Sequence, residues 1–228
     1  MRQTIGPTGI LNVRSLAAAV CIALAAAGHA AAQLATRPVA EWIKVLDAEE
    51  RLAGLKTTEV VASLKLKPGD VVADLGAGAG PFVVPFATAV GPTGKVYAVE
   101  VDRNFFPYIE KRSKAAGMSN VQTVLGAFVD PALPTADVDV AFLHDVLHHI
   151  QDRPGYLKAA AKYLKPGGRI AIIDYHPSQS PHRDDPGLVV SKEQAVSWLA
   201  PAGFKPVDDI SLFDEKWFMV FARGGEAR

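Results

Sequence analysis

The chain has 228 residues, of which 49% are hydrophobic and 21% charged, so it is long enough for a well-packed domain and lacks the composition of disordered proteins. Its 24 basic residues balance its 24 acidic residues, and this leaves no basic excess for contact with nucleic acid phosphates. We therefore expect one globular unit and no nucleic acid partner.

The first 32 residues have the three parts of a secretory signal peptide. Arg2 and Arg14 make a basic start, the apolar run SLAAAVCIALAAAG follows, and alanines at positions 30–32 offer a cleavage site. An uncleaved anchor helix is the alternative, because residues 15–32 approach the roughly 20 apolar residues that span a bilayer. The prediction is cleavage near Ala32, export to the periplasm or cell envelope, and no stable membrane insertion of the mature protein.

The remaining chain alternates between helical and strand patterns. Residues 33–66 form an expected N-terminal helical cap, with two helices broken around residues 54–58, and residues 67–228 form the main domain. Strands are expected at residues 71–75, 96–101, 121–125, 138–144 and 170–175, and helices at residues 81–90, 104–116, 154–164 and 192–202. Two final runs, residues 206–213 and 216–222, have no helix between them. The pattern predicts an α/β fold with a mostly parallel seven-stranded sheet, helices on both faces and a C-terminal antiparallel hairpin.

A glycine-rich loop follows the first expected strand. Asp74 precedes Gly76, Gly78 and Gly80, and glycines at such a junction allow a tight turn and close approach of a ligand to the main chain. A dinucleotide fingerprint of the form GxGxxG would need a glycine where the chain has Pro81. The spacing therefore disfavours a nicotinamide-dependent oxidoreductase.

The run DLGAGAG, from Asp74 to Gly80, matches the first motif of the class I methyltransferases, D-x-G-x-G-x-G, and the chain resembles that family over about residues 64–223. The resemblance implies a Rossmann-like fold and S-adenosylmethionine as cofactor. It implies that the loop, including Ala77, contacts the methionine part of the cofactor.

The resemblance also places an acidic residue at the end of the second strand, where it holds both ribose hydroxyls. Glu100, in VYAVEVD, occupies that position. A carboxylate suits this role because it accepts charge-assisted hydrogen bonds, each worth about 1.5–3 kcal/mol. Asp102 projects to the same side and is the alternative, but it lies further from the strand end.

After the third strand the family often carries Gly-Asp, whereas this chain has Gly126 and Ala127. The backbone at Ala127 or Phe128 is therefore expected to flank the adenine. Asp130 either replaces the family's carboxylate or belongs to a turn.

The segment HDVLHHIQD resembles the fourth motif of the family, which faces cofactor and substrate, and His144 is assigned to the cofactor site. His148 or Asp145 is the hypothetical proton acceptor, because an imidazole titrates near pH 6.5. The alternative is that the histidines cap or pack the following turn. No metal is expected, because the adjacent His148 and His149 would point apart on a helix and no cysteine can assist.

Residues after the fifth expected strand are candidates for contact with the substrate. Tyr175 and His176 lie where parallel sheets place their ligand crevice. The loop HPSQSPHRDDPG contributes His182 if it is a lid over the substrate, and is otherwise a solvated surface loop.

Methyl transfer from a sulfonium is a direct displacement, so the protein mainly aligns and desolvates the reactants. We expect transfer to a small-molecule acceptor. Arsenite is excluded, because related enzymes bind it through thiols and the only cysteine, Cys21, lies in the leader. The alternative is an S-adenosylmethionine-binding protein of the same fold without turnover, since export would separate the protein from the cytoplasm, where the cofactor is made.

Overall fold

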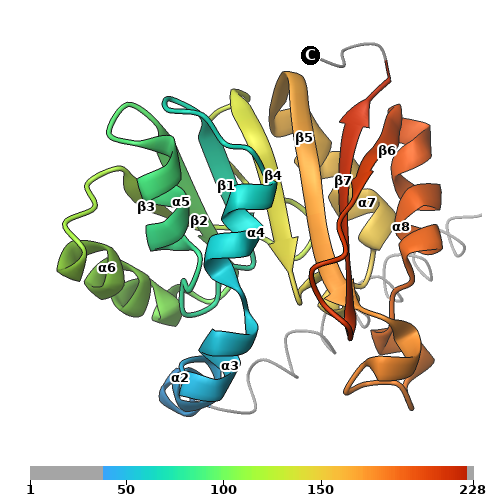
Figure 1. Cartoon of the computed structure of the whole chain (residues 1–228), viewed down its shortest axis with the longest axis horizontal. Helices are drawn as coiled ribbons and strands as arrows, with labels where there is room; N and C mark the ends of the chain where they lie inside the picture. Colours follow the sequence, from blue (N-terminus) through green and yellow to red (C-terminus); the bar gives the residue numbers. More distant parts are fainter. Residues whose placement is uncertain (1–37, 225–228) are drawn as a thin grey trace, which may run out of the picture. The chain divides into compact units, whose positions relative to one another are not determined.

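In the computed structural model, which describes residues 38–224, seven strands form one sheet with helices on both faces (Figure 1). The strands are β1 Val71–Leu75, β2 Lys95–Glu100, β3 Val121–Leu125, β4 Val138–His144, β5 Leu164–Tyr175, β6 Phe204–Asp209 and β7 Lys216–Arg223. Their order across the sheet is β3-β2-β1-β4-β5-β7-β6. Strands β1 to β5 are parallel, and β7 runs antiparallel to both β5 and β6. The predicted fold class is confirmed.

The described α-helices are α2 Val39–Leu46, α3 Glu49–Gly54, α4 Thr57–Ser63, α5 Val83–Val90, α6 Phe106–Ala115, α7 Arg153–Ala160 and α8 Lys192–Leu199. Helices α5 to α8, which belong to the main domain, agree with the sequence pattern in number and position. Short 3-10 turns precede α6 and follow α7 and α8, so these helical regions are as long as predicted. Within residues 38–224 no helix is both long and apolar enough to span a bilayer. The predicted signal peptide, residues 1–32, lies outside the described residues.

The N-terminal region differs from the expectation of two helices. The expected break is present, where Lys56 adopts a left-handed conformation with φ 47° between α3 and α4. A second break separates α2 from α3 at Ala48, whose backbone is extended with ψ 132°. The side chain of Asp47 forms an ion pair with Arg112 of α6 at 2.7 Å. This contact between distant segments anchors the break, and helical spacing alone did not predict it.

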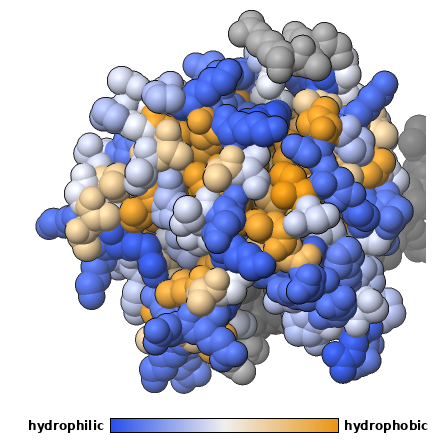
Figure 2. Space-filling view, viewed as in Figure 1, coloured by the Kyte–Doolittle hydropathy of each residue, from blue (hydrophilic) through white to orange (hydrophobic). Residues whose placement is uncertain are grey.

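Two large apolar clusters, and a small one around Val83 and Ile109, lie between the sheet and its helices in the described structure. One large cluster contains Phe86 of α5 and Phe142 of β4, together with residues of α4. The other large cluster contains Leu157 of α7, Leu199 of α8 and Trp217 of β7. Because β1 and β4 contact helices on both faces, their sequences are nearly continuous apolar runs, as expected of central parallel strands. Figure 2 shows the molecule from the same side as Figure 1, and on this face hydrophilic and hydrophobic residues are interspersed.

The sheet has a topological switch point between β1 and β4. The chain proceeds from β1 to β2 and β3 on one side, and then returns to place β4 and β5 on the other side. In open α/β sheets, ligands bind outside the carboxyl ends of the strands at such a point. The loops after β1, β2, β4 and β5 therefore form the region in which a functional site is expected.

Candidate functional site

The glycine loop after β1 is held between the ends of β2 and β4. Gly76 has φ +80°, and a Cβ atom at this position would lie 2.5 Å from Cγ2 of Val146, in the segment after β4. The backbone N–H groups of Gly76 and Ala77 donate to the carbonyl oxygen of Val99 in β2, at 2.9 and 3.0 Å. Gly78 and Gly80 also have positive φ angles, of +55° and +73°. The loop therefore needs glycine for both its backbone conformation and its close packing.

Glu100 lies directly against this loop. Its Oε2 accepts a hydrogen bond from the N–H of Gly78 at 3.0 Å, and its Oε1 accepts one from the N–H of Val101 at 2.7 Å. Burial raises the pKa of this carboxyl, and the backbone hydrogen bonds partly oppose the increase. Oε1 also accepts a longer hydrogen bond from the N–H of Asp102, at 3.4 Å. A carboxylate oxygen has two lone pairs, so Oε2, which accepts one hydrogen bond, retains capacity for a hydroxyl donor from a ligand.

Asp102 has a different local role. It is the N-cap of a 3-10 turn, and its Oδ1 accepts hydrogen bonds from both the backbone N–H and the side-chain amide of Asn104, at 2.9 and 2.8 Å. Between the two acidic residues, only Glu100 contacts the glycine loop in the described structure. Its predicted role at the ribose is thus the better supported one.

Asp74 is buried at the end of β1, with 2% of its surface exposed. Its Oδ2 has no hydrogen-bond partner among the described residues. Burial, with a smaller contribution from the charge of Glu100, raises its pKa to about 7. An unpaired carboxylate oxygen inside a protein is costly, by about 1–3 kcal/mol or more, and a cationic ligand would reduce that cost. The position therefore fits a ligand that carries positive charge, as S-adenosylmethionine does on its sulfonium and ammonium groups.

The segment after β3 forms a tight turn. The backbones of Ala127 and Asp130 exchange two hydrogen bonds, and Asp130 Oδ1 accepts from the N–H of Ala132 at 2.8 Å and from the hydroxyl of Tyr163 at 2.6 Å. Of the two alternatives for Asp130, the turn is the one its contacts support. Phe128 is 39% exposed at the tip of this turn and is available to cover a flat ring. Its contact with adenine stays a prediction.

A buried charged group follows β4. Asp145 Oδ2 accepts a hydrogen bond from Lys216 Nζ at 2.8 Å, and the same ammonium lies 3.5 Å from His144 Nε2. Burial lowers the pKa of His144 to about 4, so this imidazole is neutral at pH 7. Burial alone would raise the pKa of Asp145, but His144 and Lys216 outweigh it and hold the pKa below its ordinary value. Asp145 is thus a poor proton acceptor.

Lys216 was missed by sequence reasoning. It opens β7 and pairs with a residue 71 positions earlier in the chain, with only 5% of its side chain exposed. The available signal was a charged residue at the start of the otherwise apolar run KWFMVFA.

His148 forms a buried dyad with Asp174, which sequence reasoning also missed. His148 lies in the 3-10 turn η2, Leu147–His149, and its Nδ1 is 2.8 Å from Oδ1 of Asp174. Asp174 also accepts hydrogen bonds from the backbone N–H groups of His148 and Tyr175, at 3.2 and 2.8 Å. A proton on Nδ1 that is shared with the carboxylate leaves Nε2 as a free acceptor. The signal in the sequence was an aspartate within the apolar strand IAIIDY.

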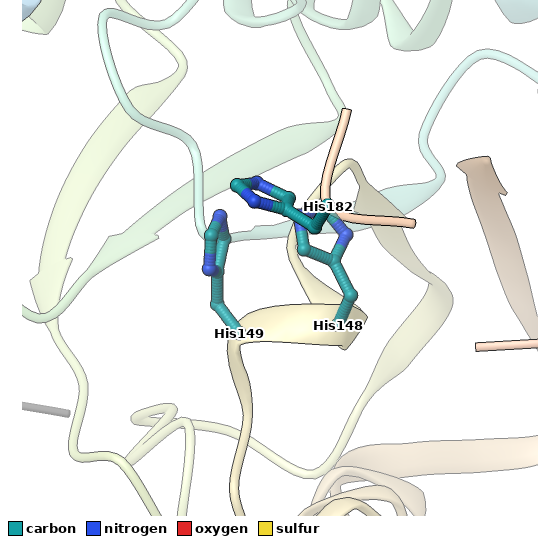
Figure 3. A group of neighbouring side chains, drawn as sticks. All are labelled: His148, His149 and His182. Atoms are coloured by element: carbon teal, nitrogen blue, oxygen red, sulfur yellow. The ribbon is translucent and has the colours of Figure 1, made fainter. Parts of the chain in front are cut away.

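The rings of His148, His149 and His182 come together, as Figure 3 shows. The ring centroids of His148 and His149 are 4.1 Å apart, and that of His182 is 5.3 and 5.5 Å from them. The expectation that the adjacent histidines point apart is therefore wrong. They occupy the last two positions of a single 3-10 turn, which ends at the extended Ile150, and the regular α-helical spacing does not apply there.

The predicted substrate residues lie at the end of β5 and in the segment that connects it to α8. Tyr175 is the last residue of β5, and His176 and His182 follow it. Tyr175 has its ring 4.6 Å from Lys216 Nζ, and burial raises its pKa to about 12. The N–H of His176 donates to the carbonyl of Glu215 at 3.0 Å. Arg153 ties the segment to η2, because its guanidinium donates to the carbonyls of His148 and Gly187. The segment that carries His182 thus packs beside the loop after β4, and its contact with a substrate stays a prediction.

Comparison with known proteins gives a consistent result. Residues 73–172 match the family model described as a methyltransferase domain. Phosphoethanolamine N-methyltransferase 1 of Arabidopsis thaliana is 34% identical over 124 residues, which are 54% of this chain and 24% of the plant protein. The 2-phytyl-1,4-naphtoquinone methyltransferase of Trichormus variabilis is 31% identical over 111 residues, which are 48% of each chain. These alignments thus span about half or less of the length of the curated relatives.

The solved structures extend the similarity to most of the fold. A S-adenosylmethionine-dependent methyltransferase from Aquifex aeolicus superposes with a TM-score of 0.73 and 25% sequence identity. The alignment covers 82% of this chain and 99% of the Aquifex chain.

Proposed function

We infer that this chain, whose residues 73–172 match a methyltransferase domain, is a class I S-adenosylmethionine-dependent methyltransferase that acts on a small-molecule acceptor. The observation that carries this proposal is the buried, unpaired carboxylate of Asp74 beside the glycine loop that Glu100 contacts. These groups lie at the switch point of the sheet, where such folds bind their ligands.

Different residues at the switch point bind different parts of S-adenosylmethionine. Asp74 and the main chain of the loop from Gly76 to Gly80, with Ala77, hold the methionine part, and Glu100 accepts hydrogen bonds from the ribose. Ala127 and Phe128 flank the adenine, and the neutral His144 borders the site from β4. Bound S-adenosylmethionine supplies an electrophilic methyl group on a positively charged sulfur. The protein's part is to exclude water and to align the acceptor with that group.

Proton removal from the acceptor falls to His148 rather than Asp145. His148 keeps Nε2 free while Asp174 holds its Nδ1, whereas Asp145 is neutralised by Lys216 at 2.8 Å. A histidine whose Nδ1 is held by a carboxylate presents Nε2 as the acceptor for a substrate proton. Tyr175, His176 and His182 surround the same end of β5 and η2, and we assign them to the acceptor.

The acceptor is small. The two curated relatives are named for phosphoethanolamine and for a phytyl naphthoquinone, and neither name refers to a macromolecule. The chain also has equal numbers of basic and acidic residues, which disfavours nucleic acid. A test supplies S-adenosylmethionine with phosphoethanolamine, a hydroxynaphthoquinone and other small nucleophiles, and measures release of S-adenosylhomocysteine. Release that depends on one acceptor supports the proposal, whereas binding of cofactor without release from any acceptor supports the alternative of a binding protein without turnover.

We also propose that residues 1–32 are a signal peptide and that the mature protein, which includes the helical cap of residues 33–66, acts in the periplasm or cell envelope. The basic start, apolar run and small residues at 30–32 support this proposal. The mass of the protein recovered from the envelope fraction tests it. Cleavage near Ala32 is expected, and an intact amino terminus in the cytoplasmic fraction would contradict it.

A further inference from the structure

Three of the six histidines of the chain form one cluster at the carboxyl edge of the sheet. His148 and His149 come from η2, and His182 comes from the connection between β5 and α8 (Figure 3). Each offers one ring nitrogen, and these nitrogen atoms all lie within 4.8 Å of one another. Methyl transfer by direct displacement does not require a group of three imidazoles, so the proposed reaction does not account for the cluster.

The most buried member of the cluster is already oriented as a ligand. Only 4% of His148 is exposed, and its Nδ1 is fixed by Oδ1 of Asp174 at 2.8 Å. Asp174 is itself held by the backbone N–H groups of His148 and Tyr175. Histidines that bind metals commonly donate their second ring N–H to a carboxylate in this way, which fixes the tautomer and makes the free nitrogen more basic.

The segment that carries His182 is held against η2 by contacts that do not involve the imidazole. The backbone N–H of His182 donates to Oγ of Ser180 at 3.0 Å, and Ser180 is 2% exposed. The guanidinium of Arg153 donates to the carbonyl of His148 in η2 and to the carbonyl of Gly187, five residues after His182, and so ties the two segments together. The approach of His182 to the other two rings is therefore built into the packing of this segment.

We propose that His148, His149 and His182 bind one divalent transition-metal ion, and that Zn²⁺ is the ion that suits them best. Neutral imidazoles are common ligands of zinc, and three of them with one open position form a known type of catalytic zinc site. Tetrahedral coordination at Zn–N distances of about 2.0–2.1 Å places the ligand nitrogens roughly 3.3 Å apart. Because His149 is exposed and His182 partly so, rotation of these two side chains can bring the nitrogens from within 4.8 Å to that spacing.

The ion would have a function at the acceptor end of the site, and this step rests on the proposed methyl transfer. An open coordination position would accept an oxygen or sulfur atom of the acceptor and lower its pKa, so that the acceptor's proton passes to solvent water. The bound anion then forms a bond to the methyl carbon as the methyl–sulfur bond breaks, and S-adenosylhomocysteine leaves. The ion uses Nε2 of His148, so in the metal-bound protein it replaces that imidazole as the group that activates the acceptor. The class of acceptor is then a small molecule with an ionisable hydroxyl or thiol.

Metal binding is tested without cofactor or acceptor. Chelator-treated protein, freed of any polyhistidine tag because such tags bind the same ions, is titrated with Zn²⁺ in competition with a chromogenic chelator. We expect one equivalent to bind, and affinity to fall at least about tenfold in His182→Asn and in His149→Asn. His176→Asn is the matched control, since this histidine lies in the same segment outside the cluster, and it leaves affinity unchanged. No binding by the wild type, or equal affinity in the wild type and His182→Asn, would overturn the proposal.

Two further measurements separate ligand loss from general damage. Co²⁺ in place of Zn²⁺ gives visible absorption bands typical of tetrahedral coordination, and these bands should disappear in His149→Asn, an exposed position where substitution does not disturb the core. Asp174→Asn, which keeps all three imidazoles, should weaken binding about 10–100-fold. Far-UV circular dichroism confirms the fold of each variant. Because no readout here depends on methyl transfer, failure of the metal proposal and failure of the proposed function remain distinguishable.

Discussion

Asp74→Asn tests the state of the buried carboxylate at the end of β1. In the folded protein the pKa of Asp74 is raised from 3.8 to about 7, chiefly by burial. A raised pKa in the folded state means that this group contributes stability that is fully present below the unfolded pKa and is lost as pH rises through about 7. The shift is about three pH units, and at about 1.4 kcal/mol per unit the loss between pH 4 and pH 8 is about 4 kcal/mol.

The assay is urea unfolding of wild type and Asp74→Asn between pH 4 and pH 8 without cofactor. Other groups titrate in this range, so the informative quantity is the difference in unfolding free energy between the two proteins. The wild type should lose stability relative to the variant by about 4 kcal/mol across the range. Asp102→Asn is the control, because this aspartate caps a turn at the surface, and its difference from the wild type should follow no such trend. A pH-independent difference between wild type and Asp74→Asn would show that the pKa of Asp74 is not raised in the folded protein.

Three other predictions concern the same edge of the sheet. The pKa of Asp74 is raised to about 7 in the folded protein, and a cationic ligand lowers it, so binding of S-adenosylmethionine near pH 7 should release protons and calorimetric enthalpies should differ between phosphate and Tris buffers; equal enthalpies would contradict this. Gly76→Ala should cost about 1–3 kcal/mol more than Gly117→Ala in chemical unfolding, because both positions have positive φ but only Gly76 would place its Cβ 2.5 Å from Val146. Lys216→Met should destabilise the fold by about 3–5 kcal/mol, because it removes the ammonium at 2.8 Å from Asp145, whose side chain is only 14% exposed, and leaves the carboxylate with the neutral His144 at 3.5 Å. The double variant Lys216→Met/Asp145→Asn should recover part of that loss; no recovery would mean that Lys216 acts through packing alone.

The strands of the sheet were predictable because each is identified by the local pattern of apolar and turn residues. β1 and β4 are short apolar runs between turn residues, and β3 and β4 have the predicted bounds. The glycine loop was also predictable, since positive φ angles favour glycine at positions 76, 78 and 80, and a Cβ atom at Gly76 would clash with Val146. Features set by local backbone geometry were therefore recovered from the sequence.

Features that depend on contacts between residues far apart in the chain were not predicted from the sequence. The dyad joins His148 to a residue 26 positions away, and Lys216 reaches Asp145 across 71 positions. The cluster of imidazoles depends on a 3-10 turn where α-helical geometry was assumed, and on a segment that brings His182 back to β4. Periodicity carries no information on such contacts, because they depend on the order of the strands in the sheet.

The central claim is tested most directly by calorimetric titration of the purified protein with S-adenosylmethionine. We expect one equivalent of S-adenosylmethionine to bind to the wild type and to Asp102→Asn. In Glu100→Ala the affinity should fall by roughly tenfold to a hundredfold, from the loss of charge-assisted hydrogen bonds worth about 1.5–3 kcal/mol. No binding by the wild type, or equal affinity in the wild type and Glu100→Ala, would contradict the binding of S-adenosylmethionine at the glycine loop and Glu100.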